Sequence, residues 1–261
     1  MDVKVIDDSE TTAALALQGP NSREILNSIS EISLNKLKFF WMINTNFNGI
    51  PVSISRTGYT GDLGYEIFLP NKLSTAVWNN LWKAGEDLGI KAIGFNALNI
   101  ARIETGFIIA NSDFITSEHA VRNNRAKKPD EIGMSWMVDM TKQYFNGKAA
   151  IQKARENNEN KFVFVALEID GKEPADGAII YHNKDLEVGI ITAATWSPTA
   201  KKSIALATLK LPYGQKIRSN LWVEIYALRE LEYFKMMKKA FIVKAPFVKL
   251  SRRNLTPPLR K

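Results

Sequence analysis

The sequence of 261 residues contains no cysteine and only two histidines, His119 and His182, which lie far apart. The absence of cysteine excludes disulfides, thiolate catalysis and zinc–cysteine sites within this chain. Two distant histidines exclude a histidine-rich metal site, and a Ser-His-Asp triad would have to use one of them. We therefore expect no metal site.

Long apolar runs are also absent, because no stretch approaches the roughly 20 residues of a membrane-spanning helix. The first ten residues are acidic and polar, unlike a secretory signal, which has a basic start and an apolar stretch. Hydrophobic residues make up 45% and charged residues 24% of the chain, which favours an ordinary globular protein over a disordered one. We expect a non-secreted, cytoplasmic protein outside the membrane.

Acidic residues are missing from the C-terminal end. Nine lysines and arginines and no acidic residue follow Glu232, whereas the net charge is +8, so the rest of the chain is close to neutral. Such a patch attracts polyanions, which include nucleic acid, an acidic partner protein or a polycarboxylate ligand. Lysines on exposed strands also discourage edge pairing. No recognised RNA-binding signature is present, so nucleic acid is the least favoured partner.

The first part of the chain predicts a mixture of helices and strands. A short apolar run ends at Leu17, and Pro20 suits the first turn of a helix. Alternating apolar residues predict strands, and apolar residues at helical spacing predict helices, with glycine as the stop signal. The predicted strands lie near 52–54 and 65–69, and the predicted helices cover 73–88, 95–105 and 147–156.

The second part has a different residue pattern, in which short runs of β-forming residues recur between turn residues. That spacing favours a barrel or sandwich over a βαβ layer. The polar stretch 156–160 reads as a boundary, which gives predicted domains 1–158 and 162–261 and an α+β fold followed by a β-barrel. The predicted strands are 162–169, 188–195, 204–209, 221–226 and 241–245.

A glycine-punctuated loop, RTGYTGDLG at 56–64, joins two of the predicted strands. Its glycines match neither GxGxxG nor a GK[ST] ending, and no helix follows whose N-terminus would face a phosphate. The favoured interpretation is a tight hairpin connection whose glycines permit positive φ. Glu66 follows the loop and points to the face opposite Tyr65 and Ile67. It is either a solvent-facing residue or a carboxylate that accepts paired N–H bonds from a flat heterocycle.

Three further residues are candidates for a functional role. Trp136 lies in GMSWMVD, and a tryptophan flanked by methionines is most often core, with stacking on a planar ligand as the alternative. Arg102 and Glu104 are predicted to make structural ion pairs or caps rather than to catalyse.

Several segments, in order along almost the whole chain, resemble the glycine-cleavage T-protein family, the aminomethyltransferases. RTGYTG followed by GYE is the most specific of them. The IARIETGF form and the TPP at 256–258 favour the broader branch, which includes folate-dependent demethylases. The segments are AALALQGPNSREIL (13–26), SRTGYTGDLGYEIFLP (55–70), GFNALNIARIETGF (94–107), PDEIGMSWMVD (129–139), GKAAI (147–151), VGIITAATWSPTAKKSIALA (188–207) and KAPF (244–247).

The resemblance implies a cloverleaf of subdomains around a central folate cavity, followed by a β-barrel. It implies tetrahydrofolate as the cofactor. Tyr59 would pack near the folate, Glu66 would bind the amino-pyrimidine edge of the pterin, and Trp136 would line the cavity. A carboxylate matches two parallel N–H donors, and aromatic rings stack on a pterin.

Two departures from the family pattern bear on activity. The family's catalytic aspartate lies upstream of the segment where this chain begins, so we expect an N-terminally truncated relative and assign no catalytic residue. Strict T-proteins have an arginine where this chain has Leu98, which favours the broader branch.

The functional expectation is therefore a tetrahydrofolate-dependent one-carbon transferase of the aminomethyltransferase or demethylase type. Its partners would be folate and a small one-carbon donor or an acidic carrier protein. The alternatives are a non-catalytic folate-binding remnant, or one half of a split enzyme whose N-terminal half is another chain. A nucleic-acid-binding relative is less favoured.

Overall fold

The computed structural model describes residues 2–122, 125–215 and 220–255, and the chain divides into two compact units. The first unit consists of Met1–Ala101 together with Lys249–Lys261, and the second consists of Arg102–Val248. The TPP at 256–258 lies outside the described residues. The domains expected from the sequence, 1–158 and 162–261, stay a prediction.

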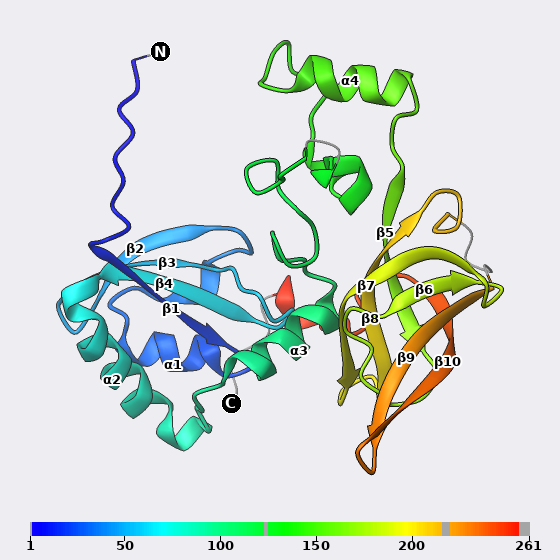
Figure 1. Ribbon diagram of the computed structural model, residues 1–261. Helices are drawn as coiled ribbons and strands as arrows, with labels where there is room; N and C mark the ends of the chain where they lie inside the picture. Colours follow the sequence, from blue (N-terminus) through cyan, green and yellow to red (C-terminus); the bar gives the residue numbers. More distant parts are fainter. Residues whose placement is uncertain (1, 123–124, 216–219, 256–261) are drawn as a thin grey trace. The chain divides into compact units, whose positions relative to one another are not determined.

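The first unit is built on a four-stranded antiparallel sheet in the order β1-β4-β3-β2. Two helices, α1 (Ser22–Ile29) and α2 (Ser74–Gly85), lie on the same side of this sheet (Figure 1). Apolar residues from that side of the strands and from both helices form one buried core, which includes Leu26, Ile54 and Val77. The strands are β1 (Thr12–Gln18), β2 (Met42–Phe47), β3 (Ile50–Ser55) and β4 (Gly64–Pro70).

The opposite side of this sheet is called here the open face, and it carries the alternate residues of each strand. Buried Tyr65, Ile67 and Leu69 of β4 point into the core, so Glu66 and Phe68 belong to the open face. The strand register places Glu66 between Ala16 of β1 and Ser55 of β3. Small side chains therefore flank this carboxylate on both neighbouring strands.

Glycines end two helices as the sequence predicts. A single 3-10 turn, Glu86–Leu88, extends α2 and ends at Gly89, whose φ is 74°. Helix α3 (Phe95–Thr105) ends before Gly106, whose φ is 78°. Residues with a Cβ adopt such left-handed angles at a cost, which explains why glycine stands at both positions. A third predicted helix is confirmed as α4 (Lys148–Glu156).

In the second unit, six strands close into a barrel in the order β10-β5-β8-β7-β6-β9 (Figure 1). Aliphatic residues such as Leu167, Ile191 and Val223 fill its interior. The expected α+β fold followed by a β-barrel is confirmed. The strands are β5 (Phe162–Ile169), β6 (Ile179–His182), β7 (Leu186–Ser197), β8 (Lys202–Lys210), β9 (Leu221–Arg229) and β10 (Glu232–Val243).

Two features of the barrel differ from the sequence prediction. The four-residue strand β6 was not predicted, and β10 begins at Glu232 rather than at 241. The first half of β10 has exposed side chains, including Tyr233 and Lys235, and it pairs with β9. Because those side chains are not buried, the strand lacks the apolar alternation that reveals strands in a sequence.

No helix in the described part of the chain combines the length and the apolar character that crossing a membrane requires.

Candidate functional site

The glycine loop is a hairpin connection, because β3 and β4 on either side of it are antiparallel neighbours. This confirms the structural interpretation of the loop and excludes a phosphate loop of the strand-to-helix type. Among its three glycines, Gly61 adopts a positive φ of 72°. The other two, Gly58 and Gly64, are required for a different reason.

That reason is the side chain of Gln18, the last residue of β1. Its Nε2 donates to the carbonyl oxygens of Thr57 and Tyr65, both at 3.3 Å, and its Oε1 accepts from the Thr60 hydroxyl at 3.0 Å. A Cβ placed on Gly58 or on Gly64 would lie 2.0 Å from Gln18 Oε1. The glutamine amide therefore occupies the space that two glycines leave, and it holds both ends of the loop.

A prediction follows for Gly64→Ala. The new methyl group has to displace the Gln18 amide and break its hydrogen bonds to the loop, so we expect a destabilisation of about 1–3 kcal/mol. In a Gln18→Ala background, the same substitution should cost much less, because its obstacle is gone. Urea unfolding of the two single variants and the double variant measures this coupling. Additive effects would show that Gln18 does not fill the space beside Gly64.

Glu66 is half-buried on the open face and is oriented by a short relay of hydroxyl groups. The Thr57 hydroxyl donates to Glu66 Oε2, and Ser55 Oγ lies 2.5 Å from Thr57 Oγ1. Within the described residues, Thr57 is the donor to this carboxylate, so Oε1 retains its capacity to accept. The carboxylate is therefore fixed at one oxygen and available at the other, beside small neighbours.

Tyr59 lies in the middle of the same loop and is half-buried, so the structure brings Tyr59 and Glu66 into one unit. Buried residues next to Tyr59 and Glu66 are also held in place. Arg56, at the start of the loop, is 1% exposed, and its Nη1 donates to the Leu37 carbonyl at 3.0 Å. Burial also raises the pKa of Tyr65, whose ring lies in the core beneath the loop.

Trp136 belongs to the second unit, in the 3-10 turn Ser135–Met137. Its side chain is 77% exposed, so the interpretation of this tryptophan as a core residue is wrong. Neighbouring Met137 is exposed too, at 65%. An exposed aromatic ring in a short turn is available for contact with a ligand.

Arg102 and Glu104 have structural roles, as predicted. Arg102 forms a buried ion pair with Asp113, with 2.6 Å between Nη1 and Oδ2. Glu104 accepts from Ser197 Oγ at 2.5 Å and from Thr199 Oγ1 at 3.3 Å, and so fixes the turn between β7 and β8. The side chains of Arg102 and Glu104, both in α3, therefore stabilise contacts within the second unit.

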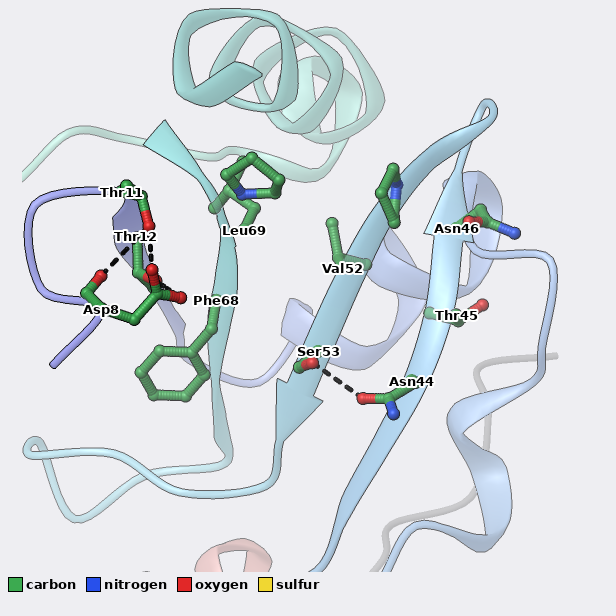
Figure 2. A pocket seen from close by; sticks show the side chains of 12 residues that line it. Asp8, Thr11, Thr12, Asn44, Thr45, Asn46, Val52, Ser53, Phe68 and Leu69 are labelled. Carbon is green, nitrogen blue, oxygen red and sulfur yellow. Dashed lines mark hydrogen bonds between the residues drawn. The ribbon is translucent and has the colours of Figure 1, made fainter. Parts of the chain in front are cut away.

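A depression of about 700 Å³ lies elsewhere on the open face, as Figure 2 shows. Phe68 projects at one side of it, and Asn44 and Ser53 are joined at 2.7 Å across β2 and β3. Asp8 is the one ionisable residue among its lining residues, and it already accepts from the hydroxyls of Thr11 and Thr12. The candidate site is placed at Glu66 because its carboxylate, unlike that of Asp8, keeps an oxygen available.

Sequence reasoning missed two residues that organise these regions. Gln18 stands in the QGP motif, which signals its importance but not its partners 39 and 47 residues away. Asp113 carries no sequence signal at all, since it lies in an irregular segment. Its carboxylate accepts from Arg102, from the Ile109 amide and from Thr192.

The sequence matches two families of domains. Residues 1–142 match the GCVT N-terminal domain, and residues 162–249 match the glycine cleavage T-protein C-terminal barrel domain. An aminomethyltransferase from Halothermothrix orenii is 35% identical over 208 residues, which are 79% of this chain and 55% of that protein. One from Thermotoga maritima is 33% identical over 253 residues, 97% of this chain and 64% of that protein.

A solved structure gives the same assignment for the fold. The crystal structure of glycine cleavage system aminomethyltransferase T from Bartonella henselae superimposes with a TM-score of 0.76 at 22% identity. The superposition covers 91% of this chain and 60% of that one. The chain therefore spans between about half and two thirds of the length of these relatives. Together, the domain matches and the shared fold show that this chain belongs to the glycine-cleavage T-protein family, the aminomethyltransferases.

Proposed function

We propose that this chain binds tetrahydrofolate and serves the transfer of a one-carbon unit to it, in the cytoplasm. The observation that carries the proposal is the Glu66 carboxylate, which Thr57 holds at one oxygen while the other remains available on the open face. Family membership supports the same class of reaction, because the related proteins are named aminomethyltransferases.

The residues present fit a pterin. An amino-pyrimidine edge offers two parallel N–H donors, and their pairing with a carboxylate is strong. Glu66 can accept one of them at Oε1 and the other at Oε2, because each carboxylate oxygen has two lone pairs and Thr57 occupies one of those on Oε2. Ala16 and Ser55, the neighbours of Glu66 on the adjacent strands, have small side chains. Tyr59 in the fixed loop would supply aromatic surface for stacking.

Each group then has a role in binding. Glu66 would recognise and orient the heterocycle, and Gln18 would keep the loop that carries Tyr59 in one conformation. Bound tetrahydrofolate supplies the nitrogen nucleophile that accepts the one-carbon unit. The protein contributes by holding it in a defined orientation, which lowers the entropic cost of the transfer. The donor would be an aminomethyl group on an acidic carrier protein, or a methylated small molecule as in the demethylase branch.

A second candidate function is folate binding without turnover, by a remnant or by half of a split enzyme. It is favoured by the chemistry of Glu66 and Tyr59, which would recognise a ring without moving a proton. Binding and transfer therefore have to be measured separately.

Isothermal titration of the protein with tetrahydrofolate tests the proposal. We expect saturable binding, and no binding of an analogue that lacks the 2-amino group. Equal heats for both compounds, or none for either, would reject a pterin site. Transfer to bound folate from a panel of aminomethyl and methyl donors then separates the transferase from the binding protein.

A further inference from the structure

The C-terminal residues 249–255 return to the first unit and contact the loop that carries Tyr59. Their 3-10 turn, Ser251–Arg253, places Arg252 opposite Asp62 of the loop. The contact is bidentate: Nη2 of Arg252 lies 2.8 Å from Asp62 Oδ2, and Nε donates to Oδ1. Asp62 Oδ1 also accepts from the Leu63 amide at 2.6 Å, so this carboxylate has a fixed orientation within the loop.

The same segment is held at a second point. Nη2 of Arg56, the first residue of the loop, donates to the Leu255 carbonyl at 2.9 Å. The C-terminal segment is therefore contacted by loop residues on both sides of Tyr59: by Arg56, three residues before Tyr59, and by Asp62, three residues after it. Gln18 of β1 contributes further contacts to the loop, through Thr57 and Thr60.

We infer that Arg252 is a positioning residue for the glycine loop 56–64: its bidentate ion pair with Asp62 fixes Tyr59 in the conformation that binds the pterin. This inference rests on the proposed folate function. The planar guanidinium fixes both the distance and the direction of the carboxylate, which a single lysine contact does not. The ion pair is partly exposed, at 37% and 16% of the two side chains. Its main effect is then on loop order rather than on overall stability.

Loop order affects affinity because a mobile loop has to be immobilised at each binding event. A loop that is already fixed avoids that cost. The charge of Arg252 is satisfied within the chain by Asp62.

The test compares Arg252→Ala, Asp62→Asn and the exchanged pair Asp62→Arg/Arg252→Asp, with Lys249→Ala as the control of equal charge. We expect the first two to weaken tetrahydrofolate binding roughly tenfold. The exchanged pair should recover most of the affinity, and Lys249→Ala should change little. If Arg252 instead attracts the ligand directly, Asp62→Asn will tighten binding and the exchanged pair will bind worst, which overturns the inference.

A second measurement does not depend on folate. Amide hydrogen exchange of residues 57–64 should accelerate in Arg252→Ala and Asp62→Asn, with the exchange of α1 and the melting temperature unchanged. Unaltered exchange in the loop would contradict the positioning role even if folate binds. Accelerated exchange together with no folate binding by the unmutated protein would reject the proposed function and leave the loop contact established.

Discussion

Replacing Glu66 by alanine is expected to weaken tetrahydrofolate binding by at least roughly 100-fold, because each of two hydrogen bonds to a charged carboxylate contributes about 1.5–3 kcal/mol. Glu66→Gln should lose most of the same affinity. The amide retains the shape but presents an NH₂ group to one of the two ligand donors. Titration calorimetry at constant salt measures both effects.

The matched control is Glu86→Ala, which removes an equal charge from an exposed position in the same unit. It should leave affinity unchanged. Melting temperatures of all three variants show whether the fold is intact, and we expect little change, because Glu66 packs at the surface of the sheet rather than in the core. Equal affinity of Glu66→Ala and the unmutated protein would remove Glu66 from the site.

Replacing Asp113 by alanine is expected to lower the free energy of unfolding of the second unit by about 3–5 kcal/mol, since it removes the carboxylate that forms the ion pair with the buried Arg102. The side chains of Arg102 and Asp113 are 3% and 0% exposed. Asp113 also satisfies the Ile109 amide and the Thr192 hydroxyl, each at 2.7 Å, and both would lose their acceptor.

The measurement has to resolve the second unit, because a chain with two units need not unfold in one step. Amide exchange of β7 and β8 provides that resolution alongside urea unfolding. Asp170→Ala, at an exposed position beside β5, serves as the control and should cost little. The double variant Arg102→Met/Asp113→Ala should be less destabilised than Asp113→Ala alone, because it removes the buried charge together with the carboxylate. A double variant that is worse than the single one would contradict this explanation.

The sequence predicts this fold well where local rules apply. Gly89 and Gly106 end helices because few other residues adopt their backbone angles, and β5 spans the same residues, 162–169, that its run of β-forming residues predicts. Prediction is weaker where exposure breaks the pattern, as in the first half of β10 and at Trp136, where methionine neighbours suggested a core position.

The candidate site was predictable only in part. Glu66 follows from strand alternation, and the loop follows from its glycines. The partners Gln18 and Arg252 do not, because they reach the loop from 39 to 190 residues away in the sequence. Asp113 contacts Thr192 over a separation of 79 residues. Such pairings depend on tertiary packing, which periodicity and turn chemistry do not encode.

The return of residues 249–255 to the first unit has a consequence for biosynthesis. During translation, α1, α2 and their sheet leave the ribosome well before the residues that pair with Asp62 and Arg56. At ordinary elongation rates, the interval is on the order of ten seconds. For that time the nascent chain carries the loop 56–64 without these two contacts, exposed to proteases and chaperones. The loop 56–64 thus gains its contacts with Arg252 and Leu255 only after the barrel has been synthesised.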